Sequence, residues 1–156
     1  MNEKQPWFVE ERATALASLL LTNRKDVVVQ PARREDAGFD LLAEVLKNGV
    51  SAGRFFGVQV AGRLELPSVE AINRDFRSDG RNGHAEFAIP LCAFLFDVRN
   101  NQGVYRWLME PVLEDGIPKL DRVGDTRWAR LDERTVNTIV DQVAGWYEAL
   151  AIQLRA

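Results

Sequence analysis

The sequence predicts a single-domain α/β protein, in which helices flank a mixed β-sheet. Apolar residues recur at helical spacing near both ends of the chain, at 9–23 and 133–154. Between these segments lie runs with the length, alternation or continuous apolar character of strands, at 38–46, 54–64 and 89–96. A length of 156 residues suits one domain with its own hydrophobic core.

The first half of the chain predicts a helix, a short strand, a polar turn and two longer strands. The helix over 9–23 opens with Glu10 and Glu11, whose carboxylates suit the positive end of a helix dipole. The β-branched run 27–29 predicts a strand, and 33–38 predicts a polar turn that ends in glycine. The two longer strands follow, joined by a hairpin-like connection.

The second half predicts a helix over 68–77 and a flexible loop over 78–83. A strand buried on both faces follows over 89–96, then a turn over 100–103 and a returning strand over 104–108. For 111–131 we expect an irregular, partly acidic connection. The final helix, over 133–154, has a wide apolar stripe suited to covering a sheet. The order helix, strands, helix, strands, helix predicts one layered α/β structure.

Composition excludes several classes of protein. Hydrophobic residues make up 46% and charged residues 28%, an ordinary globular balance. No apolar run reaches the roughly 20 residues that cross a bilayer, and residues 1–6 lack the order of a secretory signal. The single cysteine, Cys92, cannot form an internal disulfide. We therefore expect a cytoplasmic protein without a membrane partner.

Few cofactor or catalytic motifs are present. The chain has no glycine-rich phosphate-binding loop, and the lone histidine, His84, excludes a histidine-rich metal cluster and has no nucleophile elbow near it. A net charge of −3 does not favour a strong nucleic-acid binder. Beyond a divalent ion, no cofactor is expected.

Two polar side chains interrupt adjacent predicted strands. Asp40 and Gln59 each lie between two apolar residues, and alternation places Gln59 with Gly57 and Ala61 on one face of its strand. Oxygen ligands of these types suit Mg²⁺. We expect the two side chains to converge in a pocket at the edge of the sheet. Asp40 has a second interpretation as a cap of the turn after Gly38, and Gln59 as part of an inward polar network.

The order of elements and these positions resemble the restriction-endonuclease-like (PD-(D/E)XK) nuclease superfamily, and within it a little-characterised bacterial domain family. The resemblance covers nearly the whole chain and implies an αβββαβ core. The segments that carry it are a glutamate in the first helix, Gly38-Phe39-Asp40-Leu41-Leu42, Val58-Gln59-Val60, Phe96-Asp97-Val98-Arg99, Tyr105-Arg106-Trp107, Glu110-Pro111 and Trp146-Tyr147.

The resemblance implies a site that cleaves phosphodiesters with Mg²⁺. In active members an aspartate and a glutamate or glutamine hold the metal, a helix glutamate contributes in some branches, and a lysine activates the attacking water. Carried over to this chain, Asp40 and Gln59 match metal-ligand positions, and Glu11 or Glu10 matches the helix acid. Ala61 stands where the family has its lysine.

Two interpretations of Ala61 follow. The role of the lysine has moved to Arg63, Arg54 or Lys47, with Arg63 on the same face of the strand as Gln59, or cleavage is lost or severely weakened. Arginine activates water poorly because it stays protonated. The first interpretation implies a Mg²⁺-dependent deoxyribonuclease. The second implies a nuclease fold that binds DNA without cutting it. Both belong to bacterial antiviral defence or mobile-element biology.

A hypothesis from a different class is a non-catalytic interaction module with no nucleic-acid role. It would dock onto a larger protein partner or form a homodimer. The acidic net charge, Ala61 and the apolar regions 104–113 and 136–150 favour this hypothesis. The tryptophans are predicted to pack in the core rather than to stack on bases: Trp107, Trp128 and Trp146.

Overall fold

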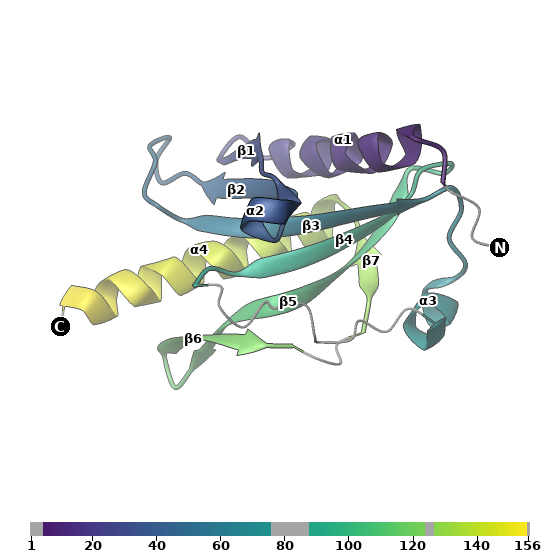
Figure 1. The fold of residues 1–156 in the computed structure, drawn as a ribbon. Coiled ribbons are helices and arrows are strands. Elements are labelled where there is room, and N and C mark those ends of the chain that lie inside the picture. Colours follow the sequence, from purple (N-terminus) through teal and green to yellow (C-terminus); the bar gives the residue numbers. More distant parts are fainter. Residues whose placement is uncertain (1–4, 76–87, 124–126, 156) are drawn as a thin grey trace.

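The computed structural model describes residues 5–75, 88–123 and 127–155 (Figure 1). Its elements, in chain order, are α1 (Phe8–Thr22), β1 (Val27–Pro31), α2 (Arg34–Ala37), β2 (Leu41–Val45), β3 (Phe55–Arg63), α3 (Val69–Asp75), β4 (Leu91–Asp97), β5 (Gln102–Glu114), β6 (Ile117–Arg122), β7 (Ala129–Leu131) and α4 (Glu133–Arg155). The predicted α/β fold with a mixed sheet is confirmed.

The sheet is open and follows the order β1-β2-β3-β4-β5-β6, with β7 pairing with β5. Neighbouring strands are antiparallel except β3 and β4, which are parallel and are separated in the chain by α3. The strands β1 and β6 therefore end the path of the sheet on its two sides. No helix within the described residues is long and apolar enough to span a bilayer.

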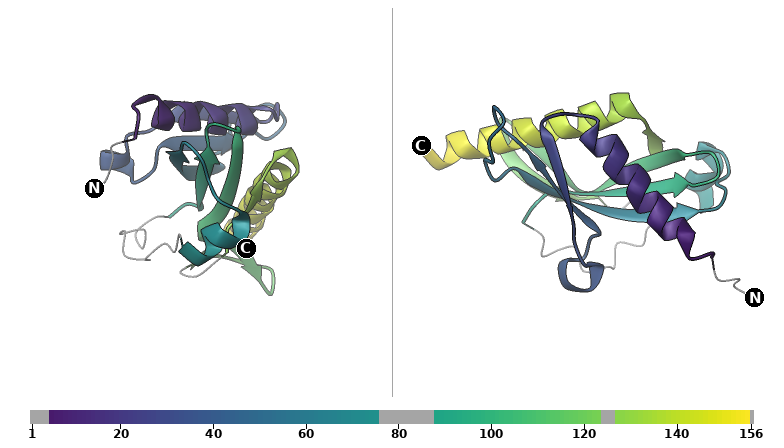
Figure 2. Two further views of the ribbon diagram at one scale, coloured as in Figure 1. Left: turned by 90° about the vertical axis from the view of Figure 1, so that its right-hand side faces the viewer. Right: turned by 90° about the horizontal axis from the view of Figure 1, so that it is seen from above.

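Helices α1 and α4 lie on the same side of the curved sheet (Figure 2). Their buried residues form the main core with the alternate side chains Phe56, Val58 and Val60 of β3. Short α3 packs on the opposite face, where Ile72 contacts Leu95 and Val104. The two faces of β3 therefore meet different helices.

Gly62 explains how closely α1 approaches β3. A Cβ atom built on Gly62 would lie 2.9 Å from both the Ala13 side chain and the Val9 carbonyl oxygen. That spacing leaves no room for a methyl group, so a glycine here lets α1 pack directly against the strand. The first turns of α1, which carry Glu10 and Glu11, are positioned by this contact.

The prediction of an irregular connection over 111–131 is wrong. Strand β5 continues to Glu114, β6 returns beside it, and β7 pairs further along β5. The reason is that β6 is a polar strand at the end of the sheet, with exposed residues on both faces and no apolar period. The turn Asp115-Gly116, with φ angles of 53° and 79°, is a hairpin signal that marks the reversal.

The other predicted elements differ mainly at their ends. The polar turn over 33–38 contains one helical turn, α2, which ends at Gly38 with a left-handed φ of 81°. The strand predicted from residue 38 begins at Leu41. The strand over 89–96 is buried along its whole length, as predicted for a central strand. The predicted loop 78–83 and His84 lie outside the described residues.

Candidate functional site

Asp40 lies in the short turn that connects α2 to β2, beside the middle of β3. Its backbone N–H donates to the Val58 carbonyl at 3.0 Å, and its carbonyl accepts from the Ala32 N–H at 2.8 Å. Strand β3 continues past the point where β2 begins, so the N–H of Val60 has no β2 partner in the ladder. The Asp40 carboxylate accepts a hydrogen bond from this N–H at 2.7 Å.

Arg34 holds the same carboxylate from the other side. Its Nε donates to Asp40 Oδ1 at 3.1 Å, and its Nη2 donates to Asp40 Oδ2. Nη2 also donates to the carbonyl oxygen of Val60 at 2.8 Å. The bidentate pair, called here the Arg34–Asp40 clasp, thus binds both backbone polar groups of Val60, as a neighbouring strand would.

An open groove of about 330 Å³ lies beside the clasp and is lined by Glu10, Glu11, Thr14, Asp40 and Val60. Its acids come from two elements that are far apart in sequence. Glu10 and Thr14 are one helical turn apart, and the Thr14 hydroxyl donates to the Glu10 carbonyl at 3.0 Å. The structure therefore brings the predicted helix acid Glu11, and its neighbour Glu10, to the same groove as Asp40.

Gln59 is placed differently from Asp40. Its Nε2 donates to the carbonyl oxygen of Gly38 at 2.7 Å, and the lining of the groove includes Val60 but not Gln59. In the sheet, Gln59 stands in register with Ala93, which pairs in turn with Arg106. The two predicted ligands therefore both tie the turn at 38–40 to β3, Gln59 through a carbonyl of the turn and Asp40 through a backbone N–H of the strand.

Ala61 packs in an apolar cluster on the face of the sheet away from α1. The buried part of that cluster is formed by Ile72, Leu95 and Val104, and Leu66, Val69 and Trp128 also pack against it. The position that the resemblance aligns with a lysine is therefore partly buried and borders an apolar cluster.

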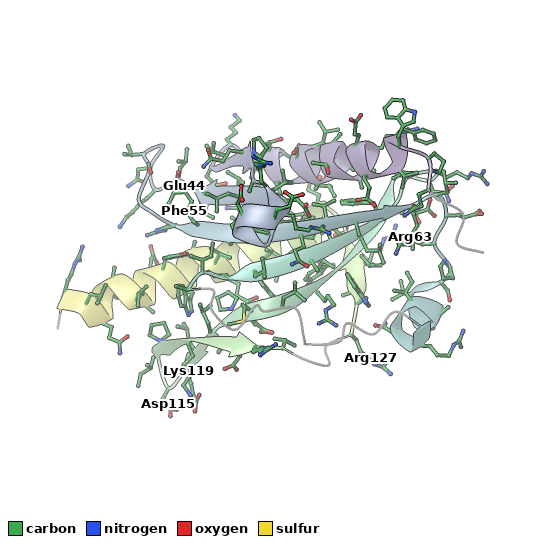
Figure 3. The ribbon with its side chains drawn as sticks, viewed as in Figure 1. Glu44, Phe55, Arg63, Asp115, Lys119 and Arg127 are labelled. Carbon is green, nitrogen blue, oxygen red and sulfur yellow. The ribbon has the colours of Figure 1, made fainter. Side chains whose placement is uncertain are left out.

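The cations considered as substitutes lie toward the two ends of β3. Figure 3 shows Arg63 at the end of the strand remote from Glu44 and Phe55. Its Nη1 donates to the neighbouring Gly62 carbonyl at 2.8 Å. Arg54 precedes the strand at the opposite end and lies 3.5 Å from Glu148. Lys47 lies in the β2–β3 connection, where its backbone pairs with that of Val50 in an isolated β-bridge.

No group of three or more His, Cys, Asp and Glu side chains within the described ranges is arranged to hold a metal ion. The groove thus offers two exposed glutamates beside the Asp40 carboxylate, whose charge is already paired with the Arg34 guanidinium. An oxygen-rich cation site would require the Arg34 guanidinium to leave the clasp.

Two arginines near the predicted site residues, Arg34 and Arg106, were not themselves predicted as site residues from the sequence. Arg34 was part of the polar turn, and the signal for its role is its spacing of six residues before Asp40 across a left-handed glycine. Arg106 is buried on the Gln59 face, donates to the Val123 carbonyl at 3.4 Å and lies 5.7 Å from the ring of Trp128.

Three of the four tryptophans and the cysteine pack in the core, whereas Trp7 is exposed. Trp107 and Trp146 are buried, Trp128 packs against two of the core clusters, and Trp146 Nε1 donates to the Lys119 carbonyl at 2.9 Å. Burial raises the pKa of the Cys92 thiol well above its ordinary value, so this cysteine stays protonated and unreactive.

Comparison with known proteins finds no matching family model, no similar curated protein and no similar solved structure.

Proposed function

We propose that this chain is a restriction-endonuclease-like domain that does not cleave nucleic acid and that acts by binding, with DNA as its first candidate ligand. Apart from the single turn of α2 between β1 and β2, the order α1, β1, β2, β3, α3, β4 agrees with the αβββαβ core that the resemblance implies. The grouping of Glu11 with Asp40 at one groove also supports the relationship. A role in bacterial defence or mobile-element biology follows from the resemblance alone.

The observation that carries the loss of cleavage is the Arg34–Asp40 clasp. Both carboxylate oxygens of Asp40 accept hydrogen bonds from Arg34, and one of them also binds the Val60 N–H. A Mg²⁺ ion requires nearly octahedral oxygen ligands at short range. A fixed positive charge on those oxygens opposes a second cation, so metal would have to displace Arg34.

The environment of Ala61 supports the same proposal. An in-line attack on a phosphodiester needs a group that activates water and one that stabilises the developing charge. Ala61 offers neither, and the cluster that it packs against is apolar. A domain of this kind keeps the fold and loses the chemistry.

Incubation of the purified protein with supercoiled plasmid and Mg²⁺ or Mn²⁺ tests the loss of cleavage. We expect no nicking above that of the Asp40→Ala variant, which removes the proposed ligand. Calorimetric titration with Mn²⁺ should show no binding at the groove. Metal-dependent cleavage that disappears in Asp40→Ala would overturn the proposal.

Fluorescence anisotropy with short duplex DNA tests the binding role. The exposed Arg33, which directly precedes α2 and Arg34 of the clasp, is the phosphate contact we expect. Arg33→Glu should weaken binding several-fold at low salt, while Lys119→Glu, on β6 at the opposite side of the sheet, should leave it unchanged. Binding should fall steeply as salt rises. A chain that shows no salt-sensitive binding excludes DNA and leaves a protein partner as the ligand.

A second candidate function, the non-catalytic interaction module, is favoured by the distribution of exposed apolar side chains. Several large ones lie at the end of the molecule where the β2–β3 connection, the β5–β6 hairpin and the end of α4 are found (Figure 1). They are Val50, Leu113, Ile117, Ile152 and Leu154. A surface of this kind marks a protein contact.

A further inference from the structure

The last turns of α4 extend beyond the body of the protein. The buried residues of this helix end at Trp146, yet the helix continues to Arg155. Both Figure 1 and Figure 2 show this end projecting past the strands. Nine residues, 147–155, follow Trp146, and they span about 13 Å at the rise of an α-helix.

This projecting segment is apolar on more than one side. Leu150 and Leu154 continue the stripe that Val143 begins on the sheet-facing side of the helix. Ile152 lies on a different side, and it is 67% exposed while Leu154 is 78% exposed. Exposed apolar side chains on two sides of a helix favour a contact with another surface. Tyr147 still packs on the main core and donates to the Phe55 carbonyl, but residues 151–155 are all exposed, and the described part of this chain supplies no cover for them.

One face of the segment is complementary to itself. Glu148, Ala151, Ile152 and Arg155 recur at i, i+3, i+4 and i+7, so they lie along one side of the helix. When two such helices run antiparallel about a two-fold axis between residues 151 and 152, Glu148 meets Arg155 of the second copy. The small Ala151 then lies opposite Ile152 and lets the helices approach closely.

We propose that two copies of this chain form a symmetric dimer by antiparallel pairing of residues 147–155 of α4. The pairing buries Ile152 at the centre and forms an ion pair at each end. Glu148 remains available for it, because its side chain is 59% exposed while one oxygen contacts Arg54 at 3.5 Å. The arrangement is isologous and closes at two copies. It does not depend on the nuclease resemblance.

The size of the contact sets the expected strength. A stable interface buries about 800 Å² on each partner, and a short helix pair alone buries less. The exposed Val50, Leu113 and Ile117 lie at the same end of the molecule and can add apolar area. We expect dissociation in the micromolar range, with the monomer–dimer balance changing with protein concentration.

Sedimentation velocity over a range of concentrations tests the dimer in the 156-residue chain. Wild type should shift toward a dimer as concentration rises, and Ile152→Glu should remain monomeric. Leu19→Glu is the matched control, because Leu19 is 68% exposed but lies on α1. It should dimerise like wild type. A wild type that is monomeric throughout, or an Ile152→Glu variant that dimerises equally well, would overturn the proposal.

A cross-link tests the antiparallel register. Cys92 is fully buried, so an introduced cysteine is the only accessible thiol among the described residues. Ala151→Cys should form an interchain disulfide on mild oxidation, since the two copies of position 151 lie near the two-fold axis. Thr138→Cys, exposed on the same helix but over the body of the protein, should not. A dimer that the first variant fails to cross-link contradicts this register.

Discussion

Asp97 and Asp40 are two strand-end carboxylates that bind backbone N–H groups in different ways. Asp97 ends β4, is 5% exposed, and accepts hydrogen bonds from the backbone N–H groups of Leu66, Arg99 and Asn100 and from the Asn100 side chain. Asp40 has one backbone donor, and its remaining contacts come from Arg34. The Asp97 carboxylate is held largely by backbone N–H groups, whereas the Asp40 carboxylate depends on the side chain of Arg34, which a mutation can remove.

The contrast separates a structural aspartate from one that has room for another function. Replacing Arg34 would leave the Asp40 carboxylate beside an open groove that already holds Glu10 and Glu11. No single replacement exposes Asp97 in this way, because three of its four donors are backbone groups. Both aspartates lie in segments on which the predicted resemblance to the nuclease superfamily rests. Of the two, only Asp40 adjoins a groove that is lined by other acids.

The largest effect is expected for Asp97→Ala. It leaves several N–H groups of a partly buried turn without their acceptor, and each such group costs up to about 1–3 kcal/mol where water does not replace the carboxylate. We expect a loss of about 3 kcal/mol in the free energy of unfolding, measured by urea denaturation. Asp97→Asn keeps one acceptor oxygen and should lose less. Equal stability of Asp97→Ala and wild type would show that the turn does not need this carboxylate.

Asp40→Ala should have a smaller effect, about 1–2 kcal/mol, because Val60 lines the open groove, from which water can reach its N–H and replace the carboxylate. Arg34→Ala should cost less than 1 kcal/mol, because the Arg34 side chain is 52% exposed and its ion pair is screened by solvent. A double-mutant cycle on the two residues measures their coupling. Additive losses would mean that the clasp contributes no joint stability.

The smallest effect is expected on the stability of the protein at low pH. Burial raises the pKa of Asp97, but the hydrogen bonds from Asn100, Leu66 and Arg99 outweigh it and hold the pKa below 3.8. A depressed pKa stabilises the folded state above the unfolded pKa, and this contribution is lost as pH falls through the folded value. Wild type should therefore lose more stability than Asp97→Asn between pH 6 and pH 3, in thermal melts of both proteins.

The elements with strong apolar period were predictable from sequence. Helix α4 and strands β3 and β4 carry long, regular patterns, and their predicted spans differ from the observed ones by one or two residues at each end. Strands β6 and β7 were missed because short, polar strands at the margin of a sheet bury few side chains. Their pairing is decided by β5, which no local pattern reveals.

The candidate site was predictable only in part. The sequence indicates that Asp40 and Gln59 occupy adjacent strands, and both do tie the same turn to β3. The alternation of side chains along a strand does not predict where the Asp40 side chain points, because β2 begins only at Leu41. The left-handed conformation of Gly38 breaks the extended backbone just before it. That same turn brings Arg34 back onto the carboxylate, a contact that depends on backbone geometry rather than on spacing alone.

The two outer strands determine how this sheet can meet other chains. Strand β1 ends in Pro31, and β6 contains Pro118 followed by Lys119. A proline has no N–H to offer to an incoming strand, and a charged neighbour disfavours further stacking of sheets. Growth of the sheet by addition of a strand from another molecule is therefore discouraged on both sides, and this protects a protein with an open sheet from fibrous aggregation.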